Sequence, residues 1–159
     1  LGRQFHHTTP WLTERHGEEA NLHRCQPPCR LGAGEGLFTK EFYGNCYNAL
    51  HEDGVMINQN ESPFYTEEAF QCQRMHRRIL ETFPICRVYQ AHIPSYPSGH
   101  WLFGFASKKY HPLDDLDKVG WKLKGIHTKY YEPRLHAGVF ALPAYVEELL
   151  EDVEKKDGR

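Results

Sequence analysis

No apolar run in the sequence approaches the ~20 residues that a membrane-spanning helix needs, and the first residues contain no apolar segment typical of a signal peptide. The formal net charge is only −2, so the chain lacks the electrostatic surface with which proteins bind nucleic acid or anionic membranes. The five cysteines are odd in number and lack the spacing of a disulfide framework, which favours reduced thiols. We therefore expect a cytoplasmic protein with no nucleic acid or membrane among its partners.

Motifs of several common sites are also missing. The sequence has no G-x-S-x-G elbow, no P-loop and no H-E-x-x-H zinc motif. The stretch LGAGEG at residues 31–36 has some glycines of a dinucleotide fingerprint, but it lacks the final spacing and no strand is expected before it. We therefore reject a dinucleotide site at this position.

Histidine is abundant, with eleven residues, but its arrangement does not predict a metal site. His23, Cys25 and Cys29 follow the spacing H-x-C-x-x-x-C, which fits no common zinc pattern. We expect no metal ligands in this protein. The alternative left open is that residues 1–31 form a metal-binding appendage.

What the chain does contain is one regular region preceded by an atypical segment. Of its 159 residues, 40% are hydrophobic and 25% are charged, which is the profile of a single soluble globular domain. Residues 1–33 are rich in His, Arg, Pro and Glu and show no periodic pattern, so we expect a segment that is disordered or results from a reading-frame shift. The regular patterns lie in residues 34–151, and residues 152–159 form a polar tail.

Helical and extended patterns alternate in the regular region. Their order, helix–strand–helix–strand–strand–helix, favours an α/β fold with an antiparallel hairpin at the edge of the sheet. We expect Gly54 to end the first helix and Thr66 to cap the second. The expected helices are residues 39–53, 66–83 and 145–156, and the expected strands are residues 55–59, 86–93 and 101–107.

The same periodicity predicts which side chains form the core. Trp101, Phe103 and Phe105 alternate along one expected strand and so share a face. A core position is a simpler explanation for them than a binding platform. The inward face of the second helix is expected to comprise Ala69, Cys72, Ile79, Leu80 and Phe83.

The strand at residues 55–59 turns polar as it ends. If the chain stays extended from Val55 to Glu61, alternate residues, including Gln59 and Glu61, point to one side of the sheet. Ligands of open α/β sheets bind at the carboxyl ends of strands, and a carboxylate beside an amide can hold a cation there. The alternative is that Glu61 simply begins a solvated loop before Pro63.

A second candidate feature is the loop PSYPSG between the last two strands. Pro94 and Pro97 restrict its backbone, and Gly99 permits a turn. Tyr96 is therefore held on a stiff arch, where its ring and hydroxyl can line a pocket. The alternative is a buried tyrosine with a structural role alone.

Four segments together resemble one family, the spermidine synthases or polyamine aminopropyltransferases. They are GEGLFTKEFY, NQNESPFY, YPSGHWLFGFASK and KYYEPRLHAGVFALPAYVEELL, and the resemblance runs from about Gly34 to Leu150. It implies the C-terminal half of a Rossmann-like, methyltransferase-type sheet in a homo-oligomeric enzyme. The implied reaction transfers an aminopropyl group from the co-substrate decarboxylated S-adenosylmethionine to putrescine and needs no metal or other cofactor.

The resemblance also implies roles for the candidate site residues. Tyr96 is similar in position to the tyrosine that lines the putrescine channel of the family. Glu61, with Gln59 beside it, is similarly placed to bind the distal ammonium of putrescine, directly or through water. A carboxylate facing a dication makes a favourable charge-assisted contact.

The sequence departs from the family pattern before residue 34. The family carries a catalytic Asp-Ser-x-Asp-Pro segment shortly before the stretch that GAGEG resembles, but no aspartate precedes Asp53, and Ala33 replaces a proline. The nucleoside-binding loop and the parallel strands that flank residues 55–59 in the family are also expected to be absent. We therefore expect no catalytic base among residues 1–34 and no activity from this chain alone. The alternative function is a non-catalytic polyamine-binding or assembly module.

Overall fold

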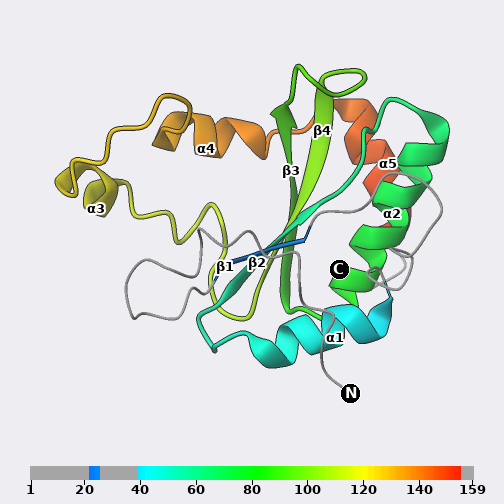
Figure 1. Cartoon of the computed structure of the whole chain (residues 1–159), viewed down its shortest axis with the longest axis horizontal. Coiled ribbons are helices and arrows are strands. Elements are labelled where there is room, and N and C mark those ends of the chain that lie inside the picture. Colours follow the sequence, from blue (N-terminus) through cyan, green and yellow to red (C-terminus); the bar gives the residue numbers. More distant parts are fainter. Residues whose placement is uncertain (1–21, 26–38, 155–159) are drawn as a thin grey trace.

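The computed structural model describes residues 39–154 in full and the backbone of residues 22–25. Within these residues, four strands form one mixed sheet in the order β1-β2-β4-β3, and five helices lie around it (Figure 1). The strands are β1 (Leu22–Cys25), β2 (Val55–Gln59), β3 (Ile85–His92) and β4 (His100–Ser107), and the helices are α1 (Lys40–Ala49), α2 (Thr66–Leu80), α3 (Lys118–Leu123), α4 (Pro133–Val139) and α5 (Ala144–Glu154).

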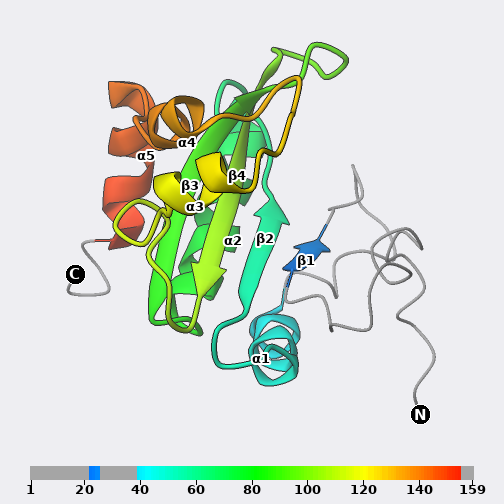
Figure 2. The same cartoon turned by 90° about the vertical axis from the view of Figure 1, so that its left-hand side faces the viewer.

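The helices cover both faces of the sheet. Figures 1 and 2 show α2 and α5 on one side, α3 and α4 on the other, and α1 near the end where β2 begins. The side chains between the sheet and the α2–α5 layer form a buried apolar cluster, and a second cluster joins α1 to the sheet. The first cluster contains Cys72, Val88, Leu102, Val146 and Leu150, and the second contains Tyr43, Leu50, Met56, Ile79, Phe83 and Ala106.

Helix α1 begins within one residue of the expected position but ends at Ala49, four residues before the expected end. The Thr39 hydroxyl accepts a hydrogen bond from the Phe42 amide at 3.1 Å, which caps the helix. Leu50 is the C-cap, and the Gly54 amide then donates to the carbonyl oxygen of His51 at 3.0 Å, so the chain turns into β2. The predicted first helix is therefore present, but the expectation that Gly54 ends it was wrong, because the backbone is already extended at Leu50 (φ −76°, ψ 142°).

The two expected strands after α2 form an antiparallel hairpin. Strand β3 pairs with β4 from Ile85 opposite Ser107 to His92 opposite His100, and β4 pairs with β2 in the antiparallel direction on its other side. Trp101 and Phe103 are buried and Phe105 is partly buried on one face of β4. The hairpin and the α/β class are thus confirmed.

The expected cap of α2 was wrong by one residue. Tyr65 has the extended backbone of an N-cap (φ −98°, ψ 134°), and its side chain makes no capping hydrogen bond. Thr66 is already the first helical residue, because the change from extended to helical backbone occurs after Tyr65. The predicted inward face is confirmed, since all five of its residues are buried, although Phe83 lies beyond the end of the helix.

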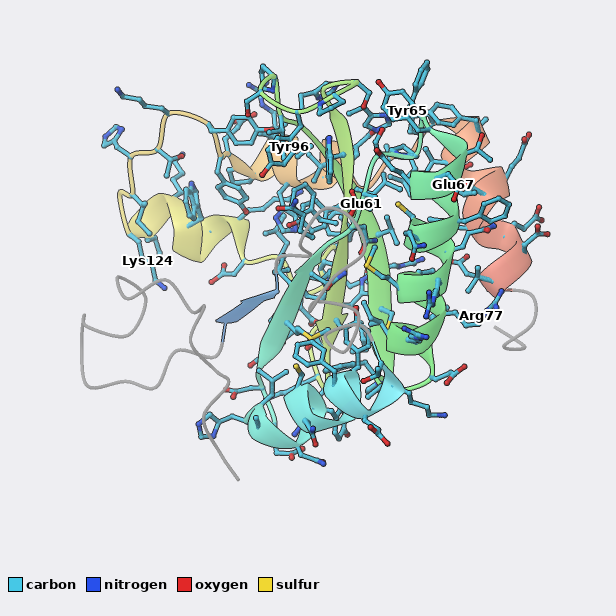
Figure 3. All side chains as sticks on the ribbon, turned by 45° about the vertical axis from the view of Figure 1, so that its right-hand side comes forward. Glu61, Tyr65, Glu67, Arg77, Tyr96 and Lys124 are labelled. Atoms are coloured by element: carbon cyan, nitrogen blue, oxygen red, sulfur yellow. The ribbon has the colours of Figure 1, made fainter. Side chains whose placement is uncertain are left out.

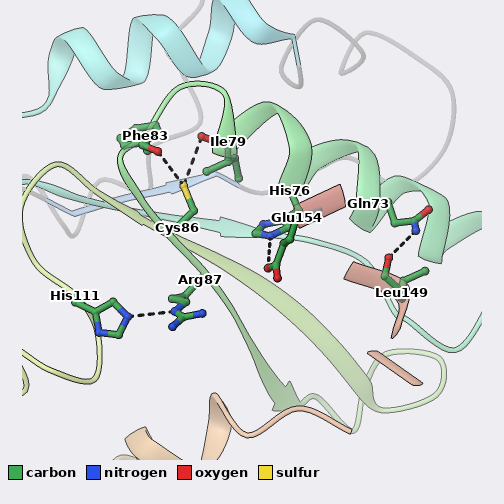
Figure 4. Close-up of polar contacts among 9 residues, drawn as sticks. All are labelled: Gln73, His76, Ile79, Phe83, Cys86, Arg87, His111, Leu149 and Glu154. Carbon is green, nitrogen blue, oxygen red and sulfur yellow. Dashed lines mark hydrogen bonds and ion pairs between the residues drawn. The ribbon is translucent and has the colours of Figure 1, made fainter. Parts of the chain in front are cut away.

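Polar contacts tie α2 to α5 (Figure 4). The Gln73 side-chain amide donates to the Leu149 carbonyl oxygen at 2.6 Å, and the buried His76 ring lies 3.2 Å from a Glu154 carboxylate oxygen. These contacts fix the helix layer on one face of the sheet. They lie away from the end of β2.

Three elements were not expected from the sequence. Helices α3 and α4 have only six and seven residues, too few for a clear periodic pattern. Strand β1 pairs in parallel with β2, from Leu22 opposite Val55 to Cys25 opposite Asn58. The expectation that no parallel strand flanks residues 55–59 was therefore wrong, because a four-residue strand leaves almost no alternation to detect. The other residues of the segment 1–33 lie outside the described residues.

Candidate functional site

The end of β2 continues in an extended form past its last strand residue. The Asn60 amide donates to the Leu102 carbonyl oxygen at 3.0 Å, and the Leu102 amide donates to the Glu61 carbonyl oxygen at 3.2 Å. Gln59 lies opposite Phe103 in the ladder. The sheet therefore holds both Gln59 and Glu61, the two residues expected at the cation site, at this end of the strand.

Burial changes the acidity of Glu61. Desolvation, and secondly repulsion from the Glu68 carboxylate on α2, raise the pKa of Glu61 to about 7. The Cys72 thiol, one helical turn after Glu68, donates to the Glu61 carbonyl oxygen at 3.3 Å. Burial first of all raises the pKa of that thiol to about 12, so it stays protonated at neutral pH. Glu61 is thus a carboxyl group that changes charge near neutral pH.

Unpartnered polar atoms surround this end of β2. Within the described part of the chain, Gln59 Oε1, Asn60 Nδ2 and Glu68 Oε2 are buried and make no hydrogen bond. Gln59 is 3% exposed and Asn60 is 1% exposed, so leaving these atoms without partners costs free energy. Two of the three are acceptors, and an ammonium group supplies the donors that acceptors need.

The PSYPSG loop forms a compact arch stabilised by its own backbone. The Ile93 amide donates to the Gly99 carbonyl oxygen at 2.7 Å, and amides within the arch close two further turns, Tyr96 to Ile93 and Gly99 to Tyr96, both at 3.0 Å. The Tyr96 ring packs edge-on against Trp101 with centroids 4.7 Å apart. Trp101 Nε1 donates to the Pro97 carbonyl oxygen at 3.3 Å. Tyr96 is partly buried, and this packing orients its ring.

The arch and the end of β2 are in direct contact. The Ser62 hydroxyl lies 2.7 Å from the Ser98 hydroxyl. Ser62 directly follows Glu61 in the sequence, and Ser98 comes two residues after Tyr96. Figure 3 shows the labelled side chains of Glu61 and Tyr96 near the same end of the sheet. The structure therefore brings together the two segments that carry the predicted site residues. Sequence reasoning missed the two serines, because nothing in the local pattern of either segment pairs residues 36 positions apart.

A separate cavity of about 820 Å³ lies beside α3 and α4 and is lined by none of Gln59, Glu61 and Tyr96. Basic side chains are frequent around it. Its lining residues are Lys118, Trp121, Lys122, Gly125, Ile126, His127, Glu132, Pro133 and Arg134.

The described residues offer neither a metal site nor a membrane-spanning helix. No group of three or more His, Cys, Asp or Glu side chains in residues 39–154 is arranged to hold a metal ion. The side chains of His23, Cys25 and Cys29 lie outside the described residues. None of the described helices is both long enough and apolar enough to cross a membrane.

Comparison with protein families gives a match over residues 27–118 to the spermine/spermidine synthase domain. Curated relatives are polyamine aminopropyltransferases. The chain is 64% identical over 125 residues to the protein of Alkaliphilus oremlandii and 61% identical over 126 residues to that of Streptococcus pneumoniae, in both cases covering 79% of this chain and 44% of the relative. The chain thus spans less than half the length of these relatives.

Solved structures give the same result. A spermidine synthase in complex with the transition-state analogue AdoDATO superimposes with a TM-score of 0.73 at 40% identity, covering 79% of this chain and 42% of that one. The spermidine synthase of Thermotoga maritima superimposes with a TM-score of 0.67 at 43% identity, covering 72% and 40%. The described part of this chain therefore shares its fold with part of these enzymes.

Proposed function

Because this chain belongs to the spermine/spermidine synthase family, we propose that it is part of a polyamine aminopropyltransferase and supplies the putrescine-binding side of that enzyme. The whole enzyme would transfer an aminopropyl group from decarboxylated S-adenosylmethionine to putrescine. In this proposal residues 34–151 are the C-terminal part of a methyltransferase-type domain in a cytoplasmic homo-oligomer. The high identity to curated polyamine aminopropyltransferases supports it.

The proposed reaction is a displacement at carbon. The neutral amine of putrescine forms a bond to the propyl carbon next to the sulfonium, the carbon–sulfur bond breaks, and its electron pair neutralises the sulfur to give methylthioadenosine. One proton must leave the attacking nitrogen to give spermidine. The protein therefore needs to align three atoms, accept one proton and anchor the second nitrogen, which remains an ammonium.

The observation that carries the proposal is the joined site at the end of β2. Glu61 is a desolvated carboxyl with a pKa raised to about 7, and the buried Gln59 Oε1 has no partner among the described residues. An ammonium placed there would donate hydrogen bonds to both Gln59 Oε1 and the Glu61 carboxylate, and its charge would favour the ionised form of Glu61. Tyr96, held on Trp101, would line the path of the carbon chain between the two nitrogens.

The proposed reaction also needs a base that removes a proton from the attacking amine. No aspartate occurs before Asp53, so the residue that the family pattern uses as a base has no equivalent among residues 1–34. This observation favours the second candidate, a non-catalytic module that binds polyamines or assembles with another chain. In either case the purified chain is expected to bind putrescine without producing spermidine.

Titration calorimetry with putrescine tests the binding proposal. We expect one site in the unaltered chain and affinity about 10- to 100-fold weaker in Glu61→Gln, the effect of losing one charge-assisted hydrogen bond. Tyr96→Phe should weaken binding less. Glu67→Gln and Tyr110→Phe are matched controls, because both side chains are exposed. Absence of diamine binding, or equal affinity in Glu61→Gln, would contradict the proposal, and spermidine production by the purified chain would contradict the expected inactivity.

A further inference from the structure

Two serine hydroxyls join the loop that carries Glu61 to the arch that carries Tyr96. Ser62 is fully buried, and its Oγ lies 2.7 Å from Ser98 Oγ. This hydrogen bond joins the side chains of the two segments, and its length is usual for a pair of hydroxyl groups. The two segments therefore meet through a specific polar contact as well as through packing.

Each hydroxyl has further partners that fix its direction. Ser62 Oγ accepts from the Phe64 amide at 3.2 Å, so its own proton is free for Ser98. Ser98 Oγ can donate to the His100 carbonyl oxygen at 3.2 Å and lies 3.3 Å from the His100 amide. With Ser62 as donor to Ser98, and Ser98 as donor to the His100 carbonyl oxygen, each hydroxyl proton in these contacts has its own acceptor.

Ser98 also has an unusual backbone conformation. Its φ is 64°, in the left-handed region that residues other than glycine adopt only at a free-energy cost. Hydroxyl contacts to Ser62 and to the His100 backbone help to hold the arch in this conformation. Serine at this position therefore has a strained backbone but provides a hydrogen bond to the neighbouring loop, and glycine would provide no such bond.

We propose that the Ser62–Ser98 pair fixes the distance between the Glu61 carboxyl and the Tyr96 ring, and so selects diamines by the length of their carbon chain. The inference rests on the proposed function, in which Glu61 anchors one nitrogen and Tyr96 lines the path of the chain. Putrescine and cadaverine differ by one methylene, and two binding groups discriminate between them only if their separation does not adjust. Preorganisation of this kind improves selectivity, because a diamine of the wrong length binds only after the site rearranges, and that rearrangement costs free energy.

The pair is tested by the ratio of putrescine to cadaverine affinity. We expect Ser62→Ala and Ser98→Gly each to reduce this ratio about three- to tenfold, the effect of losing one partly buried hydrogen bond. Ser98→Gly removes the hydroxyl and also relieves the strain of the positive φ, whereas Ser62→Ala leaves residue 98 unchanged. A similar effect in both variants therefore belongs to the contact and not to the strain. Ser95→Ala is the matched control, since it removes an exposed hydroxyl of the same arch, and it should leave the ratio unchanged. A general loss of stability would weaken both diamines equally and keep the ratio constant.

Amide hydrogen exchange without ligand separates this inference from the proposed function. Ser62→Ala should speed exchange of the Gly99 amide, which closes the arch, about tenfold while leaving α5 unaffected, and Ser95→Ala should not. If the chain binds no diamine, the proposed function fails and the selectivity claim fails with it, whereas faster exchange still supports the link between the loops. Unchanged exchange in both Ser62→Ala and Ser98→Gly overturns the link. Faster exchange with an unchanged affinity ratio overturns its role in selectivity.

Discussion

Glu61 at the end of β2 and Glu68 in the first turn of α2 repel each other electrostatically, and this repulsion adds to the larger effect of burial on Glu61. Together they raise the pKa of Glu61 from 4.5 to about 7. The Cys72 thiol beside them stays neutral because its own pKa is raised to about 12. The protonation state of the proposed ammonium anchor is therefore set by a second acid from a different element.

Diamine affinity should depend on pH as a result. A cation favours ionised Glu61, so binding is expected to strengthen as pH rises from about 5 to 8 and to release a proton below pH 7. Glu68→Gln removes the repulsion, lowers the pKa of Glu61 and moves this rise to lower pH. The measurement is calorimetry at several pH values in buffers of different ionisation enthalpy.

Glu67→Gln is the control for that experiment. Glu67 is exposed and lies in the same first turn of α2 as Glu68, so it removes the same charge from the same end of the helix. If Glu67→Gln shifted the pH profile as much as Glu68→Gln, the effect would belong to the helix terminus and not to the carboxyl pair. A flat profile in the unaltered chain would contradict the anchor role of Glu61.

The sequence predicted the elements that carry the site better than the contacts between them. Strand 55–59 and the hairpin followed from short apolar runs bounded by turn residues, and both are present. The ladder ends at Gln59 opposite Phe103, so the expectation that Gln59 and Glu61 point to one side stays a prediction. Local patterns were sufficient here because strand identity depends on neighbours in the sequence.

Local sequence patterns could not predict the contacts between segments that lie far apart in the chain. The Ser62–Ser98 hydrogen bond and the influence of Glu68 on Glu61 arise only when the arch and α2 fold against the end of β2. The Thr66 cap was misplaced by one residue because the capping preference of threonine does not decide the start of α2, whose N-cap Tyr65 makes no side-chain capping hydrogen bond. Four-residue β1 and the short helices α3 and α4 offer too few residues for periodicity to show.

Glu154 on α5 should contribute stability that acid removes. Its hydrogen bond with His76 is the main cause that lowers the pKa of this carboxyl below 4.5. A group with a lowered pKa in the folded state stabilises the fold above its ordinary pKa, and this contribution is lost as pH falls through the lowered value. Denaturant unfolding between pH 6 and 3 should therefore show a smaller loss of stability in Glu154→Gln than in the unaltered chain. Glu148→Gln, which changes an exposed carboxylate on the same helix, should retain the full loss.

Lys108, which directly follows β4, donates a hydrogen bond to the C-terminal end of α1. Its Nζ donates to the Leu50 carbonyl oxygen at 2.8 Å and lies 4.5 Å from the centre of the Tyr47 ring. The Lys108 side chain is only 8% exposed, so Lys108→Met leaves a carbonyl oxygen without its charged donor and should cost about 1–3 kcal/mol of unfolding free energy. Lys109→Met, at an exposed neighbouring position, should change it by less than about 0.5 kcal/mol. Equal effects in urea unfolding would show that the Leu50 contact contributes no stability.

Two glycines should respond in opposite directions to the same substitution. A Cβ at Gly104 on β4 would lie 3.3 Å from Cδ1 of Ile79, and Ile79 is buried between α2 and the sheet. The Ile79 side chain must therefore shift by a few tenths of an ångström in Gly104→Ala, which should destabilise the fold by about 1–3 kcal/mol. A Cβ at Gly44 in α1 would meet nothing within 4 Å, and Gly44→Ala should raise the unfolding free energy by about 0.5–1 kcal/mol because alanine loses less backbone entropy in a helix. Urea unfolding of both variants checks the signs. If Gly104→Ala proved neutral, the Ile79 side chain would have room to shift, and the packing between α2 and β4 at this point would not limit the size of the side chain at position 104.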